Sequence, residues 1–110
     1  MSARLFKLVF TVPHSSLEVC KQAVFSAGAG IFPGGKYTEV CFETQGTGQF
    51  IPSAEAKPAI GEAGKVVKVE ETKVEVQCIG KDVVVAAVDK LKRAHPYEEV
   101  AYEVYAMEDV

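Results

Sequence analysis

Alternation of apolar and polar positions opens the chain and predicts its first strand. Over residues 5–12 every even position is apolar, whereas Lys7 and Thr11 interrupt the odd positions. Leu5 and Val9 add apolar side chains to the second face as well. This pattern predicts a strand with both faces at least partly covered, in the centre of a sheet.

After Pro13 the apolar residues recur with the spacing of an α-helix. Ser15 and Glu18 have the spacing of a capping box, and apolar residues then recur every three or four positions. Gly28 follows, and glycine is the residue type that most often ends a helix, because it readily adopts a left-handed backbone conformation. The pattern predicts a helix over residues 16–27.

The middle of the chain alternates again but is interrupted by glycine and proline. Residues 37–44 predict a second strand, and Gly46-Thr47-Gly48 predicts a turn into a short strand at 49–51. Residues 53–64 contain one proline and two glycines and show no period. We expect an ordered surface excursion there.

The last third predicts a long strand, a helix and a final strand. The long strand covers residues 65–79, but its apolar positions change from odd to even, which predicts a bulge or a bend near residues 70–73. Asp82 is the expected N-cap of a helix that Pro96 ends. The final strand is expected over residues 99–107.

This order of elements predicts an α+β fold. Two β-α-β halves form a ferredoxin-like βαββαβ sandwich, in which an antiparallel sheet carries both helices on one face. A chain of 110 residues fits a single domain, residues 1–110. The hydrophobic fraction of 48% argues against disorder.

The charge and the distribution of apolar residues argue against nucleic acid and membranes as binding partners. The net charge is −3, the pI is about 5.4, and the lysines are scattered, so no basic field for nucleic acid is present. The sequence contains no signal-peptide core and no apolar run of membrane-spanning length. We therefore expect no nucleic acid, no membrane and a cytoplasmic location.

The cysteines and His14 do not predict a catalytic site. Cys20, Cys41 and Cys78 lie within apolar segments without a CxxC spacing, which favours buried reduced thiols over a disulfide or a zinc site. His14 precedes the first helix and reads as a solvated loop histidine; a pairing with His95 is conceivable. No Ser-His-Asp or Cys-His arrangement can be recognised.

The densest group of functional residue types is His95-Pro96-Tyr97-Glu98-Glu99, at the junction of the second helix with the last strand. Imidazole and carboxylate together suit a divalent metal, for which His95 is the candidate ligand. Alternatively His95 continues the apolar stripe of Leu91 and packs into the core. Glu98 and Glu99 are adjacent, so in an extended segment they point to opposite faces.

The second candidate is Gly46-Thr47-Gly48-Gln49-Phe50, whose backbone amides could cradle a phosphate. It lacks the Lys-Ser/Thr pair and the following helix of a P-loop. A hairpin turn is the structural alternative.

These motifs together resemble a known family. KLVFTVP near the start, Gly46-Thr47-Gly48-Gln49-Phe50, Val69-Glu70-Glu71 and the closing HPYEEVAYEVY are similar to the PII-like or CutA-like domain inserted in YqfO-type NIF-three-like proteins. That domain also occurs as a stand-alone chain. The resemblance implies a homo-oligomer, a trimer or a dimer, and a small-molecule effector, a protein partner or a divalent metal as ligand.

The resemblance leaves two functions open. The larger proteins hold a dinuclear metal centre in a scaffold without counterpart in these 110 residues, which favours a non-catalytic binding or regulatory domain of poorly defined molecular function. The alternative is a metal-dependent hydrolase, similar to the GTP-cyclohydrolase homologues, with its site near HPYEE. A third reading makes HPYEE a packed corner. The expected binding residues are Gly46, Thr47, Gly48, Gln49, His95, Tyr97, Glu98 and Glu99.

Overall fold

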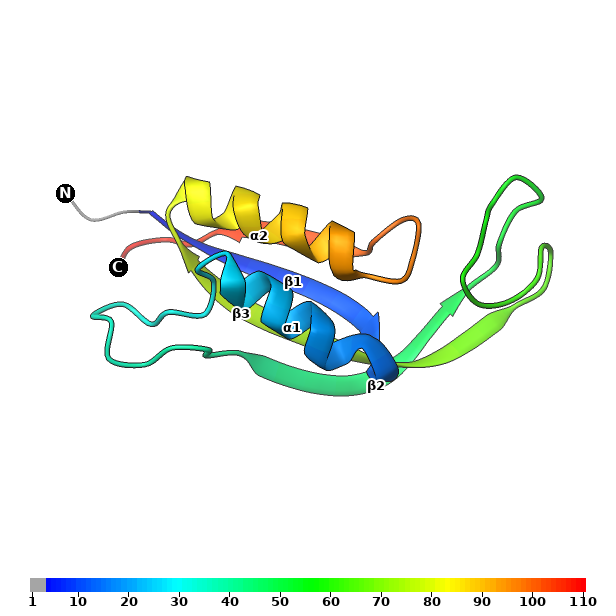
Figure 1. Cartoon of the computed structure of the whole chain (residues 1–110), viewed down its shortest axis with the longest axis horizontal. Coiled ribbons are helices and arrows are strands. Elements are labelled where there is room, and N and C mark those ends of the chain that lie inside the picture. The colour runs from blue at the N-terminus through cyan, green and yellow to red at the C-terminus, as the bar shows by residue number, and fades with distance from the viewer. Residues whose placement is uncertain (1–3) are drawn as a thin grey trace.

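The computed structural model describes residues 4–110 as a four-stranded antiparallel sheet with two α-helices on one face (Figure 1). The elements follow in the order β1 (Leu5–Pro13), η1 (His14–Ser16, a 3-10 turn), α1 (Leu17–Ser26), β2 (Phe42–Phe50), β3 (Val67–Ile79), α2 (Lys81–Ala94) and β4 (Tyr102–Ala106). The strand order is β2-β3-β1-β4. This arrangement confirms the ferredoxin-like α+β fold.

The core lies between the sheet and the two helices. The even-numbered residues of β1, and those of β3 from Thr72 onward, face the helices and are almost fully buried, as are the inward residues of α1 and α2. Burying one such aliphatic side chain stabilises the fold by roughly 1.5–3 kcal/mol. The largest of these side chains are Phe10, Leu8, Leu91, Val12, Val24, Val74 and Val76.

Strand β3 is paired without interruption, so of the predicted bulge or bend near residues 70–73 the bulge is wrong. Its pairing with β1 and with β2 keeps one register through this segment. The apolar parity changes because the neighbours change. From Thr72 onward the even residues meet the helices, whereas Val67 points to the other face, against Gly61 of the excursion.

Strand β2 replaces two predicted strands and a turn. It starts at Phe42 rather than at residue 37 and runs without a break to Phe50, so the turn at Gly46-Thr47-Gly48 is wrong. Both glycines have extended backbone and pair with β3. Glu39, whose φ of 54° is left-handed, interrupts the segment that was expected to be extended.

The predicted caps differ from those observed. Ser15 lies inside η1 and Ser16 precedes α1 without a side-chain cap bond, so the capping box is wrong. Gly80 precedes α2, and Asp82 stands in the first turn, where its charge favours the positive end of the helix dipole. Gly28 does end the first helical segment with φ of 101°. The last strand is shorter than predicted, because residues 96–99 form a bend.

The β2–β3 hairpin extends beyond the helices as an arm, at the right of Figure 1. Residues 51–66 connect its strands at the far end and form the expected excursion. The molecule is elongated, 51 Å long against 25 and 22 Å in the other directions. No helix in residues 4–110 is long and apolar enough to cross a membrane.

Candidate functional site

His95 is a buried corner residue with both ring nitrogens occupied. Nε2 lies 2.8 Å from the Thr11 carbonyl oxygen, and Nδ1 lies 3.1 Å from the Tyr97 amide nitrogen. Because the carbonyl only accepts, Nε2 carries the proton and Nδ1 accepts the Tyr97 N–H. His95 therefore fixes the turn after α2 to strand β1, as the packed-corner reading expects.

Tyr97 connects the corner to β3. Its hydroxyl donates a hydrogen bond of 2.9 Å to Oε2 of Glu71. Burial, and then the bond to the Glu71 carboxylate, raise the pKa of the Tyr97 phenol well above its ordinary value. The phenol therefore stays protonated as a hydrogen-bond donor.

Gly48 leaves room for the same carboxylate. A Cβ added at Gly48 would collide with the carboxylate of Glu71, whereas one added at Gly46 would meet nothing within 4 Å. A side chain at Gly48 would therefore displace the Glu71 carboxylate, whereas glycine lets this carboxylate lie against β2. In this way the GTGQF and HPYEE segments meet through a third residue, Glu71.

Two more contacts join the corner to the arm. The rings of Phe50 and Tyr97 pack edge-on, with centroids 5.7 Å apart and an interplanar angle of 65°. Oε1 of Glu98 accepts a hydrogen bond of 2.9 Å from the amide of Lys57, in the excursion. The excursion is thereby held against the segment that follows α2.

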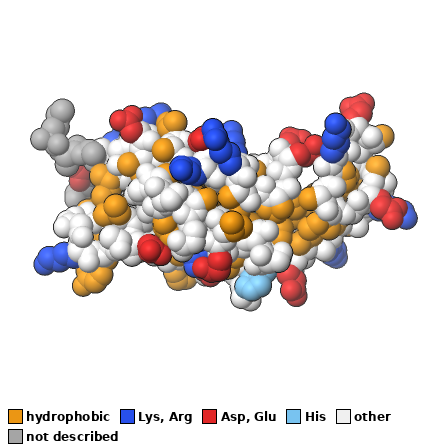
Figure 2. Space-filling view, in the orientation of Figure 1, with side chains coloured by type: hydrophobic (Ala, Val, Ile, Leu, Met, Phe, Trp, Pro, Cys, Tyr) orange, Lys and Arg blue, Asp and Glu red, His pale blue; other side chains and the backbone are white. Residues whose placement is uncertain are grey.

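These contacts border an open cleft of about 560 Å³, which lies between the corner, the sheet and the excursion. Its walls combine apolar surface from Phe50, Ile51 and the prolines and alanines of the excursion with the carboxylates of Glu71, Glu98 and Glu99. No lysine or arginine of residues 4–110 lines it. Apolar side chains also remain visible at the surface between the body and the arm in Figure 2.

The structure brings together five of the eight expected binding residues. Gly48, Gln49, Tyr97, Glu98 and Glu99 lie in or beside the cleft. Adjacent Glu98 and Glu99 both line it, contrary to the expectation of opposite faces, because residues 96–99 bend instead of extending.

The other expected residues lie outside the cleft. His95 supports the wall from the buried side. Gly46 and Thr47 line a separate hollow of about 390 Å³ with His14 and Thr72.

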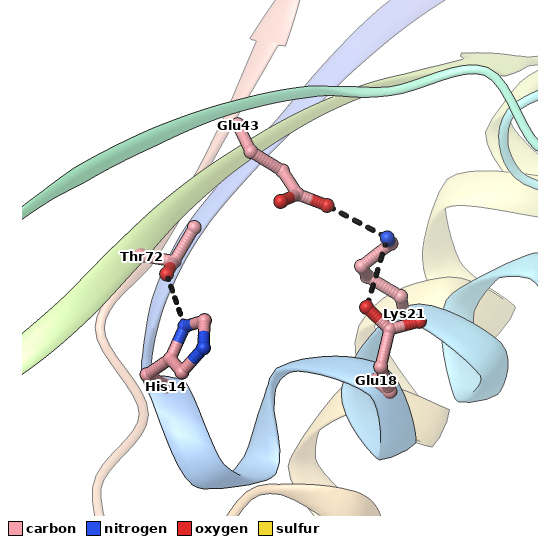
Figure 3. A network of polar contacts seen from close by, with 5 residues as sticks. All are labelled: His14, Glu18, Lys21, Glu43 and Thr72. Carbon is pink, nitrogen blue, oxygen red and sulfur yellow. Dashed lines mark hydrogen bonds and ion pairs between the residues drawn. The ribbon is translucent and has the colours of Figure 1, made fainter.

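His14 and Thr72, which line that second hollow, belong to a set of polar contacts on the helix side of the sheet (Figure 3). His14 Nδ1 lies 3.5 Å from Thr72 Oγ1, so the neighbour of His14 is Thr72 and not His95. Lys21 of α1 pairs with Glu43 of β2 at 2.7 Å and with Glu18 at 3.2 Å. The bond to Glu43 raises the pKa of Lys21. The Lys21–Glu43 pair joins α1 to the first part of β2, whereas the Lys21–Glu18 pair lies within α1.

The cysteines are free thiols. Cys20 and Cys78 are buried in the core, and burial raises the pKa of each to about 11. Cys41 is half-buried, and its thiol pKa is also raised, mainly by burial. Thiols whose pKa lies above the ordinary value are poor nucleophiles at neutral pH.

Sequence reasoning missed the importance of Glu71 and of the excursion. Glu71 belongs to Val69-Glu70-Glu71, and nothing in the local sequence distinguishes it from Glu70. The available signal was Gly48: a glycine inside an extended pattern indicates a close approach by another group. The pairing of Gly48 with Val69 in β3 places the Glu71 side chain beside it.

Comparisons with known proteins agree with this fold. No family model matches the chain. The "GTP cyclohydrolase 1 type 2 homolog" of Bacillus subtilis is 39% identical over 104 residues, covering 94% of this chain and 27% of that protein. The protein of the same name in Mycobacterium bovis is 41% identical over 108 residues, covering 96% and 27%. The chain resembles one domain-sized part of these proteins. It spans only about a quarter of their length.

Solved structures identify the kind of domain. The Bacillus cereus protein related to NIF3 has a TM-score of 0.80 at 32% identity, covering 99% of this chain and 27% of that one. The chain also has the PII/CutA-like fold. Bacillus subtilis GlnK in complex with ATP gives a TM-score of 0.61 at 18% identity, covering 97% of this chain and 84% of that one. Ehrlichia chaffeensis divalent ion tolerance protein CutA1 gives 0.66 at 12%, covering 98% and 85%.

Proposed function

We propose that residues 1–110 form a single non-catalytic binding or regulatory domain of the YqfO-insert type, whose ligand site is the cleft between GTGQF and HPYEE. The observation that carries the proposal is the meeting of the two motifs through Glu71, which Gly48 accommodates and Tyr97 binds. Concave, largely apolar sites with a few convergent polar groups are typical of ligand binding.

The chemistry of the cleft supports binding over catalysis. A general base or nucleophile needs a free, activated group within reach of the substrate. His95 uses both ring nitrogens on the backbone, and the raised pKa of Tyr97 disfavours the phenolate. Two carboxylates, Glu71 and Glu98, already accept hydrogen bonds.

The alternative, a metal-dependent hydrolase near HPYEE, would require His95 to give up a backbone hydrogen bond. No group of three or more His, Cys, Asp or Glu in residues 4–110 is arranged to hold a metal ion. Metal analysis of the freshly purified protein tests this alternative. Stoichiometric zinc or manganese that disappears in His95→Ala would support the hydrolase and contradict the binding proposal.

The uncovered face of the sheet supports a homo-oligomer, either a trimer or a dimer. This face carries exposed aromatic residues, Phe42 on β2 and Tyr105 on β4, and both strands are sheet edges that another copy can pair with or cover. The three free cysteines fit a reducing compartment, and we place the protein in the cytoplasm. Light scattering after gel filtration tests the assembly; a monomer at micromolar concentration contradicts it.

A matched pair of tryptophan variants tests the cleft. Ala59 and Ala54 are exposed alanines of the same excursion, but only Ala59 lines the cleft. Thermal shift against nucleotides, amino acids, polyamines and divalent metals identifies ligands, and titration calorimetry measures their affinity. We expect Ala59→Trp to abolish binding and Ala54→Trp to retain it. Absence of any ligand in the panel, or a ligand unaffected by Ala59→Trp, contradicts the proposal.

A further inference from the structure

The charge of the cleft restricts what it can bind. Its ionisable lining groups, apart from the Tyr97 phenol, are the carboxylates of Glu71, Glu98 and Glu99, and no cation of residues 4–110 lines it. Phosphate sites need lysine, arginine or converging backbone amides, so a nucleotide would meet only repulsion here. Charge complementarity therefore selects a cationic occupant.

The spacing of the charges favours an organic cation over a metal ion. A metal site draws oxygen ligands together around one point, and no group of three or more candidate ligands in residues 4–110 does so. The lining beside these carboxylates is mostly apolar, and the rings of Phe50 and Tyr97 pack against each other there. An alkyl-guanidinium or alkyl-ammonium group matches this surface, because its stem packs on apolar atoms while its head meets a carboxylate.

Glu99 is the carboxylate available for this contact. Glu71 accepts the Tyr97 hydroxyl, and Glu98 accepts the Lys57 amide. Within residues 4–110 the structure gives Glu99 no hydrogen bond or ion pair, and the residue is exposed at the mouth of the cleft.

The shape of the cleft favours an extended peptide over a compact molecule. Small-molecule sites usually enclose most of the ligand surface, whereas here the lining residues Ile51, Ser53 and Ala101 are exposed and the cleft is open to solvent. It also runs into the end of β2, and β2 is an edge strand of the sheet. An edge strand offers main-chain groups to a peptide that lies beside it.

We propose that the cleft binds an extended segment of a partner protein in which a lysine or arginine is flanked by apolar residues. The cationic head pairs with Glu99, and the flanking side chains cover Phe50, Ile51 and the excursion. This proposal rests on the proposed function, since it names the ligand of the same cleft.

Fluorescence anisotropy with synthetic peptides tests the charge selection on the full chain. The probe is a fluorescein-labelled Ala-Val-Leu-Arg-Leu-Val-Ala peptide, and its controls carry citrulline or glutamate in place of arginine. Citrulline keeps the shape and removes the charge. We expect the arginine peptide to bind at least about five-fold more tightly than the citrulline peptide at ~0.05 M salt, and this ratio to shrink at ~0.5 M because salt screens exposed charges. Equal binding of all three peptides, or binding of none, overturns the proposal.

Charge-removing variants localise the contact. Glu99→Gln should weaken the arginine peptide roughly three- to ten-fold and leave the citrulline peptide unchanged, as expected for loss of a charge-assisted hydrogen bond. Glu55→Gln removes an equally exposed carboxylate of the excursion that does not line the cleft, and it should leave both affinities unchanged. Equal losses in the two variants would mean long-range attraction without a site, which contradicts the proposal.

The two experiments together distinguish failure of the peptide proposal from failure of the proposed binding site. If no peptide binds but a panel ligand still depends on the Ala59→Trp and Ala54→Trp pair, the peptide proposal fails and the binding site stands. If peptides and panel ligands all fail, both proposals fail together.

Discussion

The helix-covered body and the corner where HPYEE meets the arm are held together in different ways. The body depends on apolar burial over many side chains, of which Leu8, Leu91 and Val76 are almost completely inaccessible. The corner depends on a few directional contacts, those of His95, Tyr97 and Glu98. The stability of the body is therefore shared among many side chains, whereas each hydrogen bond of the corner depends on one specific partner.

Strand β3 belongs to both regions. Its even residues from Thr72 onward supply the core, and on its other face Val67 meets the excursion while Glu71 meets Tyr97. One regular strand thus carries a stability surface and a candidate binding surface on opposite sides. Substitutions on one face of β3 should therefore change the stability of the fold, and substitutions on the other face should change the candidate binding site.

The largest effect is expected in the body. Leu91→Ala should lower the free energy of unfolding by about 3 kcal/mol, because it leaves a cavity in a fully buried site. Val85→Ala, on an exposed position of the same helix, should change it by less than about 0.5 kcal/mol. Urea unfolding measures both. Similar losses would mean that α2 is not packed on the sheet through Leu91.

His95→Ala should have the next largest effect, about 2 kcal/mol, because it leaves the Thr11 carbonyl and the Tyr97 amide without their partner. The control is His14→Ala, since His14 is exposed and makes only a 3.5 Å contact. Thermal melts and urea curves compare the two. If both variants are as stable as the wild type, His95 does not hold the corner.

Tyr97→Phe should cost about 1 kcal/mol at neutral pH by removing one hydrogen bond to a carboxylate. The pKa of Tyr97 is raised above 10.0 in the folded protein, so its contribution is complete below pH 10.0 and is lost as pH rises further. The difference between the wild type and Tyr97→Phe should therefore shrink in strong alkali.

Tyr105→Phe is the matched control for this pH dependence. The Tyr105 hydroxyl also bonds a glutamate, Glu103, but the pair is exposed on the surface. Its removal should change stability little at any pH, because water screens such a pair. Ultraviolet titration of the tyrosines checks the order: in the wild type Tyr97 should ionise last.

The smallest effect is expected at the glycines of β2. Gly46→Ala has open space around it and should raise stability by a few tenths of a kcal/mol, because alanine loses less backbone freedom than glycine. Gly48→Ala should lack this gain, because the Glu71 carboxylate must move away from Tyr97. Equal effects of both substitutions in urea unfolding would show that the missing side chain at Gly48 is not what makes room for the Glu71 carboxylate.

Much of the fold follows from local sequence periods. Strands β1 and β3 and both helices were predicted close to their positions, because burial on one face imposes a regular spacing, whereas the largely exposed β2 was predicted as two strands and a turn. The bulge in β3 was wrong because the parity change came from a new neighbour, residues 51–64, which no local pattern reveals. The turn at Gly46-Thr47-Gly48 was wrong because Gly48 serves a contact with Glu71 on the adjacent strand.

The candidate site was only partly predictable. The GTGQF and HPYEE segments were singled out by composition, but their meeting depends on contacts between residues far apart in the sequence, such as Glu71 with Tyr97 and Lys57 with Glu98. The sequence offers Glu99 only as one of eight expected binding residues, and the structure places it at the mouth of an apolar cleft.

A double-mutant cycle between Tyr97→Phe and Glu71→Ala tests most directly that the two motifs form one unit. Urea unfolding at neutral pH gives the free energy of each single variant and of the pair. Our account predicts a coupling energy of about 1 kcal/mol, because removing either partner already breaks the one hydrogen bond they share. Effects that add to within about 0.3 kcal/mol would mean that the two residues act independently, and would contradict the account.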